Sequence, residues 1–510
     1  MSTRGAWWAA AALVSVSLLA PLLIVDVPPV LDYPNHLARF VLLASGDADP
    51  ILAPMFEPHW TIIPNLAADL VAPEMLHLMP VHIAGRVLLG SILLLNLAGV
   101  VALHRVLFRR RSYWPLASAL VAYNAGFLLG FLNWEIGCGL AMLAAAGWLR
   151  WREPRPAATI AGASVTTVAL FFCHLVAPLF FLVLIGSAEV QAAWRDQRWL
   201  HRGMALLPAI VPPLVLAWLA PLRDAPAQTH WMTPQEKLLQ LVSPFINYLL
   251  PLDVGSAVLV ASGVAIAIVL GWVAVSRRMV PAIALLAALY IVLPFDLKSA
   301  SFLDTRIALM LGFLLFAATE PTRLPAWTRR VAAVALITLF AIRMAVLAEA
   351  WAKQRHDLAE LRSVIANVPP GASVYMTNVP PEEAPTYWAS GPHSRILSNG
   401  LRAEYHLPAL LVIEQHAFWP LLFANPAQQP IRLRPTYARL AREAHDIPPH
   451  AALVADPGAG SADLRQFDYA LMLEAGADRN LAGFVPRCLT LMSRTNFAAL
   501  FRVRRDAASC

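Results

Sequence analysis

The chain contains few charged residues for its length. Only 14% of its 510 residues are charged, whereas 58% are hydrophobic and the mean hydropathy is +0.59. A soluble protein of this composition would leave much of its apolar surface in contact with water. The composition therefore predicts a protein that lies in a lipid bilayer.

Cysteines are also scarce, and their spacing excludes two further classes. Cys138, Cys173, Cys488 and Cys510 show no metal-ligand spacing, so neither a zinc site nor a disulfide framework is expected. Cys488 and Cys510 can still pair if their segment is exported. The Lys and Arg residues cluster in short loops between apolar runs and no DNA-binding motif appears, so the net charge of +7 does not indicate a nucleic-acid partner. The sequence also has no internal repeat and no low-complexity segment.

Long apolar runs dominate the first two thirds of the chain. A membrane span needs about 20 apolar residues, and runs bounded by polar or basic loops predict about eleven transmembrane helices. These runs lie approximately at 6–25, 82–103, 114–132, 136–149, 157–173, 175–191, 204–221, 254–275, 280–295, 305–319 and 331–350.

Arginines mark every second loop between these runs. They are Arg4, Arg105, Arg109, Arg110, Arg111, Arg150, Arg152, Arg155, Arg195, Arg198, Arg202, Arg277, Arg278, Arg323, Arg329 and Arg330. Cytoplasmic loops are rich in Lys and Arg, so we expect the amino terminus inside a bacterial inner membrane and the carboxyl terminus outside. The first run has no small-residue cleavage site and is expected to be retained as a signal anchor.

The composition changes after Trp351. Residues 352–510 contain no spanning run; instead, turns rich in Pro and Gly separate short apolar segments such as 373–376 and 469–473, which predict buried strands. We therefore expect a membrane domain at 1–351, with a long first external loop at 26–81, and a soluble periplasmic α/β domain at 352–510. Residues 350–360 are expected to continue the last span as a helix.

A short polar stretch follows the first apolar run. It places Asp32, Tyr33, Asn35 and His36 within five residues, and Pro34 restricts the local backbone. Such a cluster is a poor lipid anchor and predicts a polar site. Leu37, Phe40 and Val41 follow at the spacing of a helix that lies along the membrane interface. Later exported loops add Asn133, Glu135, His174, Trp231, Lys298, Asp304 and Arg306, so polar residues from five loops are expected to converge on one face.

This layout resembles the GT-C superfamily of polyprenyl-phosphate-sugar-dependent glycosyltransferases, which includes the protein O-mannosyltransferases and the aminoarabinose transferases. In sequence the resemblance rests on Asp32-Tyr33-Pro34-Asn35-His36, and in architecture it covers the whole chain. It implies transfer of a sugar from a polyprenyl-phosphate donor to an envelope glycan, lipid or protein on the periplasmic face. The paired acids usual in the family's first external loop are absent here, because Asp32 stands alone.

The resemblance also implies roles for individual residues. Asp32 is the candidate catalytic base, and His36, at i+4, would orient Asp32, bind the acceptor or act as an alternative base. Arg306 is the candidate phosphate ligand. The other candidates for substrate binding are Tyr33, Asn35, Asn133, Glu135, His174, Trp231, Lys298 and Asp304. No metal-ligand cluster is evident, and a divalent cation would need a second ligand from Glu57, Asp69 or Glu135.

Other interpretations of the same residues stay open. Asp32 can cap the helix that begins after Pro34, and Arg306 can form a structural ion pair with Asp304. A secondary transporter would carry ionisable residues near the middle of the membrane, where this chain has only Arg86 near one end of a span and Arg343 inside the last. A flippase-like or assembly protein would hold lipid-linked glycans on the same face without chemistry.

Overall fold

The computed structural model describes residues 3–221, 229–297, 300–378, 394–441, 464–481 and 485–505. The chain is mostly helical (62%), as expected of a polytopic membrane protein. Six helices in the described ranges are long and apolar enough to cross a membrane. They are α1 (Thr3–Leu19, continued by the 3-10 helix η1, Ala20–Leu23), α4 (Val81–Phe108), α7 (Pro156–Cys173), α8 (Ala177–Asp196), α12 (Leu250–Val269) and α15 (Ala326–Ile365).

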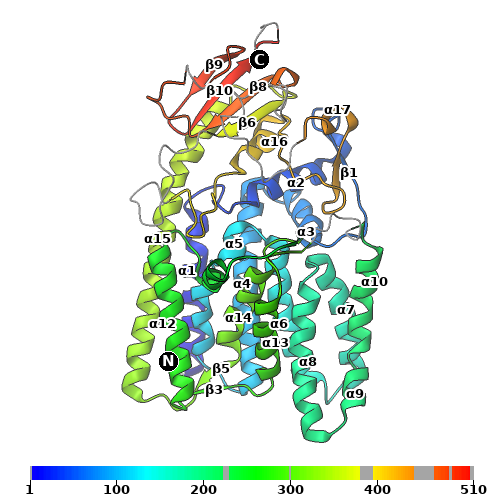
Figure 1. Cartoon of the computed structure of the whole chain (residues 1–510), viewed down its shortest axis with the longest axis vertical. Helices are drawn as coiled ribbons and strands as arrows, with labels where there is room; N and C mark the ends of the chain where they lie inside the picture. The colour runs from blue at the N-terminus through cyan, green and yellow to red at the C-terminus, as the bar shows by residue number, and fades with distance from the viewer. Residues whose placement is uncertain are drawn as a thin grey trace.

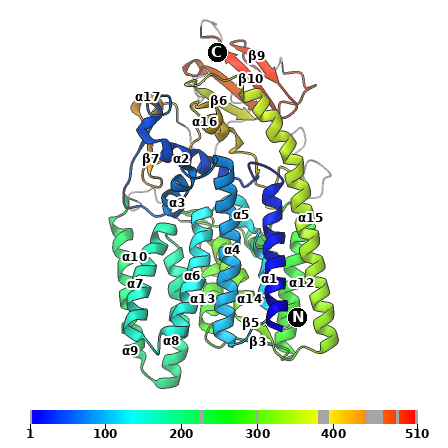
Figure 2. The ribbon, with the colours of Figure 1, turned by 180° about the vertical axis from the view of Figure 1, so that it is seen from behind.

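Shorter helices complete the bundle beside these six (Figures 1 and 2). They are η3 (Trp114–Val121) with α5 (Ala125–Leu129), α6 (Leu132–Trp151), α10 (Leu207–Leu219), α13 (Val280–Val292) and α14 (Leu303–Ala317). Every apolar run that the sequence predicts contains helix of this bundle. Several helices begin with Pro in the first turn, for example α7 at Pro156, because the first-turn N–H has no intrahelical partner to lose.

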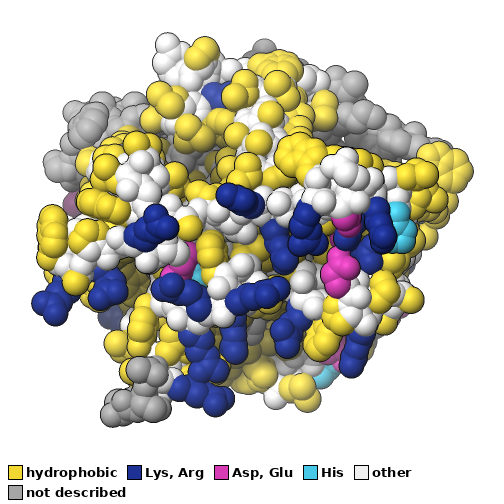
Figure 3. Space-filling view, turned by 90° about the horizontal axis from the view of Figure 1, so that it is seen from below, with side chains coloured by type: hydrophobic (Ala, Val, Ile, Leu, Met, Phe, Trp, Pro, Cys, Tyr) yellow, Lys and Arg dark blue, Asp and Glu magenta, His cyan; other side chains and the backbone are white. Residues whose placement is uncertain are grey.

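The arginine-rich loops lie together at one end of the bundle. The Trp7 indole donates to Ser112 O (2.8 Å) and so joins the start of α1 to the loop after α4. Arg110 pairs with Glu320 (2.7 Å) of β5 (Thr319–Pro321), and Arg202 of α9 (Trp199–Met204) pairs with Glu189 of α8 (3.2 Å). Figure 3 shows Lys and Arg side chains spread over this face, which is the clustering that the loop charges predict.

A buried ion pair links α15 to α12 inside the bundle. Arg343 Nη1 lies 2.8 Å from Asp253 Oδ1, and both residues are buried. Asp253 Oδ2 also accepts from the Asn247 backbone N–H (2.7 Å) and the Ser398 hydroxyl (2.6 Å). Arg343 donates further to Phe245 O (2.7 Å). The ionisable group inside the last predicted span is therefore neutralised by a fixed partner.

A four-stranded sheet lies at the other end of the molecule, beyond the end of α15 (Figure 1). Its order is β6–β8–β10–β9, with β6 and β8 parallel and the other pairs antiparallel. The strands are β6 (Val374–Asn378), β8 (Tyr469–Leu473), β9 (Leu489–Arg494) and β10 (Ala498–Val503). Both strands predicted from the sequence form, and they are neighbours in the sheet. As expected, α15 continues past residue 350 as a single helix to Ile365.

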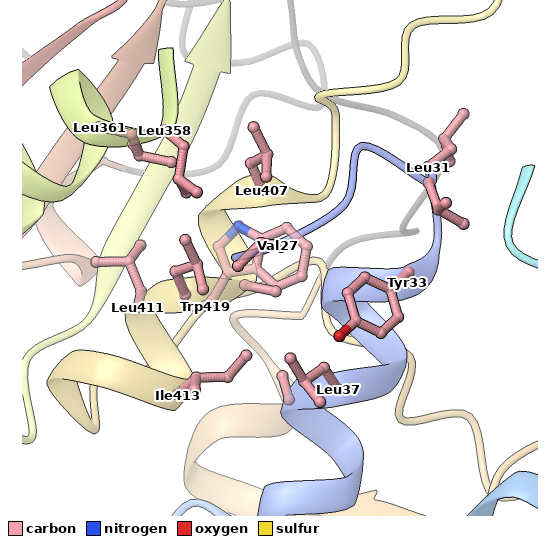
Figure 4. Packing of buried hydrophobic residues seen from close by; sticks show 14 of the residues in the cluster. Val27, Leu31, Tyr33, Leu37, Leu358, Leu361, Leu407, Leu411, Ile413 and Trp419 are labelled. Atoms are coloured by element: carbon pink, nitrogen blue, oxygen red, sulfur yellow. The ribbon is translucent and has the colours of Figure 1, made fainter. Parts of the chain in front are cut away.

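The loop at 26–81 is covered by the carboxy-terminal part of the chain. Its helix α2 (Tyr33–Ser45) contacts η6 (Leu407–Ala409) and α16 (Leu410–Gln415), and β1 (Phe56–Pro58) pairs with β7 (Ile431–Leu433). In Figure 4, Leu37 of α2 lies near Ile413 of α16.

This cover changes the role of α2. Leu37 and Phe40 are completely buried within the protein, so α2 differs from the expected helix with its apolar face in the membrane interface. The large apolar side chains that the loop exposes are instead Trp60 and Ile62, together with Leu70, Val71 and Leu78 of α3 (Ala67–Leu76) and its end.

One hydrophobic core extends across residue 351. It includes Val30 and Leu37 from the first loop, Leu361 from α15, and Trp419 and Leu471 from the carboxy-terminal part. Because α15 also crosses this position without a break, the loop and the carboxy-terminal part fold against each other. Cys488 is buried immediately before β9, whereas Cys510 lies outside the described residues, as does the pairing of the two that the sequence left open.

The remaining elements in the described ranges are short. They are η2 (Gly46–Ala48), β2 (Thr229–His230), α11 (Pro234–Gln240), η5 (Ser243–Phe245), β3 (Val273–Val275), β4 (Asp296–Leu297), α17 (Pro435–Ala438) and η7 (Leu464–Gln466). Two small sheets, β2–β4 and β3–β5, join loops at the two ends of the bundle.

Candidate functional site

The turn between α5 and α6 is the centre of the candidate site. The backbone N–H groups of Leu31 and Asp32 donate to Leu128 O (2.9 Å) and Leu129 O (3.1 Å). Gly130 follows with φ +86°, and a Cβ at this position would lie 2.8 Å from Asp32 Cβ. Glycine is therefore required both by the backbone angle and by the close approach of Asp32.

Asp32 faces a histidine from the carboxy-terminal part. Asp32 occupies the N-cap position of α2, but its side chain makes no capping hydrogen bond. Its Oδ1 lies 3.1 Å from Nδ1 of His406, which is only 1% exposed. The Asp32 side chain keeps 12% of its surface exposed. The geometry therefore differs from the simple cap that the sequence left open, and it adds His406 to the candidate site.

His36 is fixed by one contact to the same turn and one within α2. Its Nε2 lies 3.1 Å from Gly130 O, and its Nδ1 lies 2.9 Å from Arg39 Nη2. Burial and the Arg39 charge hold the pKa of His36 well below its usual 6.5. His36 is therefore neutral, with Nε2 donating to Gly130 and Nδ1 accepting from Arg39. It contacts Arg39 rather than Asp32, and Arg39 in turn binds Asp69 through Nε (2.6 Å).

Tyr33 and Asn35 point into the protein. The Asn35 amide donates to Leu421 O (2.9 Å) and accepts from the Phe423 N–H (2.8 Å). Tyr33 is fully buried against Gly85 of α4, and its hydroxyl has no hydrogen-bond partner in the described part of the chain. These two predicted substrate-binding residues instead connect α2 to α4 and to the carboxy-terminal segment.

Arg306 contacts the same turn at Phe131. Its guanidinium carbon is 4.8 Å from the centre of the Phe131 ring. Nη1 donates to Ser301 O, and Nε has no hydrogen-bond partner among the residues that the structure describes. Arg306 is 8% exposed, and no described carboxylate lies within 4.0 Å of it. Asp304 Oδ1 accepts from the Thr305 N–H instead (2.7 Å). The ion pair of Asp304 with Arg306 is therefore not formed, and the buried cation is available to an anion.

His174 adds a second basic side chain near Arg306. It lies at the end of α7, where its Nδ1 accepts from the Val176 N–H (3.1 Å). Burial, and to a smaller extent the Arg306 charge, lowers the pKa of His174 well below 6.5. His174 is therefore a neutral hydrogen-bonding group beside the guanidinium.

Aromatic rings join two further loops to this turn. The Phe131 ring is 5.4 Å from Phe302, Phe302 is 4.7 Å from Phe295, and Phe295 is 6.1 Å from His230. Trp231, next to His230, is 56% exposed. Lys298 lies outside the described residues.

Asn133 and Glu135 stand at the start of α6 and have structural partners. Asn133 accepts from the Ala68 N–H (2.7 Å) and donates to Asn65 O (2.6 Å), which fixes the start of α3. Glu135 is 1% exposed and accepts from Asn96 (2.8 Å). Its other carboxylate oxygen has no partner among the described residues.

The three acids considered as second metal ligands all have other partners. Asp69 binds Arg39, Glu57 binds Arg434 (2.9 Å), and Glu135 binds Asn96. Within the described ranges, no three His, Cys, Asp or Glu side chains are grouped to hold a metal ion. The cation that approaches the Gly130–Phe131 turn is Arg306.

Charged residues anchor the segment that carries His406. Arg402 contacts both Glu404 and Glu474, and Arg395 pairs with Asp357 of α15 (2.7 Å). Burial raises the pKa of Glu404 to about 7. These contacts hold the backbone two residues before His406, so they position the imidazole beside Asp32.

The sequence predicts Asp32, His36 and Arg306 as site residues, and the structure brings all three to one turn. The sequence pattern does not indicate His406 and Arg39, which contact Asp32 and His36, because neither belongs to a local motif. The signal that could have identified Arg39 is its i+3 spacing from His36, whereas no sequence spacing connects Asp32 with His406. Comparisons of this chain with protein-family models, curated proteins and solved structures gave no match.

Proposed function

We propose that this protein is a membrane glycosyltransferase that transfers a sugar from a polyprenyl-phosphate donor to an envelope glycan, lipid or protein. The observation that carries the proposal is the Gly130–Phe131 turn, which Asp32 approaches at Gly130 and Arg306 approaches at Phe131. A carboxylate and a cation at one site suit the transfer of a sugar away from a phosphate.

Asp32 would act as the base in this reaction. The acceptor hydroxyl oxygen attacks the anomeric carbon while its proton passes to the Asp32 carboxylate. The bond from the anomeric carbon to the phosphate oxygen breaks, and polyprenyl phosphate leaves with the bonding electrons. A single displacement of this kind inverts the anomeric centre. His406, 3.1 Å from Asp32, would hold the carboxylate in position.

Arg306 would bind the phosphate. A planar guanidinium can donate two parallel hydrogen bonds to phosphate oxygens. The buried setting strengthens such bonds, since water competes less for the charge there. The neutral His174 imidazole, on whose pKa the Arg306 charge acts, would assist.

An apolar groove offers a place for the lipid chain of the donor. It has a volume of about 560 Å³ and lies between α7, α8, α10 and α13. Its lining includes Leu175, next to His174, and continues to Val190 and Leu206. A phosphate at Arg306 could therefore carry its hydrocarbon chain into this groove.

The proposed arrangement in the membrane follows from the charges. The arginine-rich face would lie in the cytoplasm of a bacterial cell and the sheet of the carboxy-terminal part in the periplasm. About eleven helices would span the inner membrane, and the α/β domain would cover the site. Charge on one face supports this orientation, and reporter fusions at Arg109 and Asp357 would test it.

The decisive experiment compares Asp32→Asn with wild type in nanodiscs, using a panel of undecaprenyl-phosphate sugars and a crude envelope fraction as acceptor. Loss of a general base should reduce transfer by roughly 10²- to 10⁴-fold, while donor binding persists. Asp47→Asn is the matched control, because Asp47 is an exposed acid of the same loop. Arg306→Gln should weaken donor binding, whereas Arg323→Gln on the opposite face should not.

Two other outcomes would contradict the enzyme proposal. If wild type binds a lipid-linked sugar without consuming it, the protein is a non-catalytic flippase or assembly protein. If wild type binds none of the donors, the result favours a secondary transporter. Against that interpretation, the charge inside the last predicted span, Arg343, is already paired with Asp253.

A further inference from the structure

A second cavity, with a partly polar lining, lies on the sheet of the carboxy-terminal part. Its volume is about 820 Å³. It opens where β8 and β9 begin and β10 ends (Figure 2 shows this sheet from behind). The lining residues are Pro369, Pro370, Ala372, Asp468, Tyr469, Thr490, Met492, Arg502, Val503, Arg504 and Arg505.

The charge of this cavity is unbalanced. Three arginines line it, and Asp468 is the one acid among the lining residues. Both oxygens of Asp468 already have partners: Oδ1 accepts from Arg505 (2.7 Å), and Oδ2 accepts from the Ser373 N–H and hydroxyl (both 2.9 Å). The carboxylate therefore neutralises the charge of Arg505, whereas the charges of Arg502 and Arg504 are not neutralised by it.

Arg502 is the most available of these cations. It is exposed, and its side chain has no hydrogen-bond or ion-pair partner among the residues that the structure describes. It stands opposite Thr490 in the β9–β10 pair, so a hydroxyl and a guanidinium lie side by side. Arg504 donates one bond to Arg487 O (2.6 Å) and keeps its charge.

The rest of the lining is suited to sugar rings. The Tyr469 ring and the Met492 side chain, which is 50% exposed, supply apolar surface beside the arginines. Sugars stack their C–H faces on such surfaces, while Arg binds carboxylate or phosphate groups in a fork. A volume of this size accommodates a ligand of several rings.

We infer that this cavity binds an oligosaccharide that carries several negative charges. This inference stands without the transfer reaction, since it depends on the sheet alone. If the proposed function also holds, the ligand would be part of an anionic envelope glycan bound at a distance from Asp32.

The test measures binding of fluorescent tetragalacturonate to the full chain in nanodiscs, with maltotetraose as the neutral probe. We expect wild type to bind the acidic sugar at least tenfold more tightly at low salt, and this preference should weaken as salt screens the charges. Arg502→Gln should lower the affinity about tenfold, because one charge-assisted contact is lost. Arg502 is exposed on the surface, so folding should not depend on it.

Arg487→Gln is the matched control. Arg487 is an exposed neighbour that offers only its backbone carbonyl to Arg504, so its replacement should change the affinity less than twofold. The inference is overturned if the two sugars bind equally, or if both substitutions weaken binding to the same extent. Neither result depends on the donor or on turnover, so failure here leaves the proposed function untouched.

Discussion

The buried pair of Arg343 and Asp253 leads to a prediction with a clear asymmetry. Asp253→Ala leaves the Arg343 guanidinium with Phe245 O and a long contact to Ser256 (3.4 Å) as its remaining partners. An orphaned charge of this kind costs about 3–5 kcal/mol. Arg343→Met leaves the Asp253 carboxylate, which still accepts hydrogen bonds from Asn247 and Ser398. The free energy of unfolding should therefore fall by less, about 1–3 kcal/mol.

The double variant separates charge from packing. Asp253→Ala with Arg343→Met removes both charges together, and Met replaces much of the arginine stem in an apolar setting. We expect the double variant to recover most of the stability that Asp253→Ala loses. The measurement is the free energy of unfolding in mixed micelles, followed by intrinsic fluorescence, for the four proteins of the cycle.

Two results would refute this reasoning. If Asp253→Ala costs less than about 1 kcal/mol, the guanidinium reaches water and the pair is not effectively buried. If the double variant is as unstable as Asp253→Ala, the loss comes from the Asn247 and Ser398 contacts rather than from the orphaned charge. Either result would require a different explanation of how α12 and α15 are joined.

Three further predictions concern single positions. Gly85→Ala should destabilise the protein by about 1–3 kcal/mol, because the new Cβ would overlap the Tyr33 hydroxyl. Gly147→Ala should be neutral or stabilising in thermal unfolding, because no described atom outside its own stretch of helix lies within 4 Å of the new Cβ. Burial raises the pKa of Glu404 from 4.5 to about 7, so the folded state holds this proton more tightly. Stability should therefore fall by up to about 3 kcal/mol as pH rises from 4.5 to 7, and Glu404→Gln should abolish that slope in unfolding curves. Because the pKa of His36 is lowered, its NMR resonances should show no titration near pH 6.5; a midpoint there would contradict the buried geometry.

The apolar pattern of the sequence predicts the bundle well for a physical reason. A lipid-facing helix must be apolar over its whole length, so runs such as 82–103 are visible without knowledge of their neighbours, and α4 forms there. Loop arginines act locally in the same way. The strands at 374–378 and 469–473 are also signalled by their own residues.

Contacts between distant segments could not be predicted in this way. Nothing near Asp32 indicates that His406 will lie 3.1 Å away, and nothing near Arg343 indicates Asp253. The sequence also suggested an interfacial role for α2, because its apolar face is visible but the segment that covers it is not. Such pairings depend on tertiary packing, which overrides local pattern.

The partners of Asn35 have a consequence for the order in which the protein is made. Its amide is held by Leu421 and Phe423, 386 and 388 residues later in the chain. Translation proceeds from the amino terminus at roughly 5–20 residues per second, so the first loop emerges long before the segment that fixes it. Until that segment arrives, α2 lacks the partners that bury Leu37 and Phe40. Assembly of the turn around Asp32 is therefore among the last steps of biogenesis, and a ribosome-stalled chain ending before residue 394 would carry every predicted span but no His406 beside Asp32.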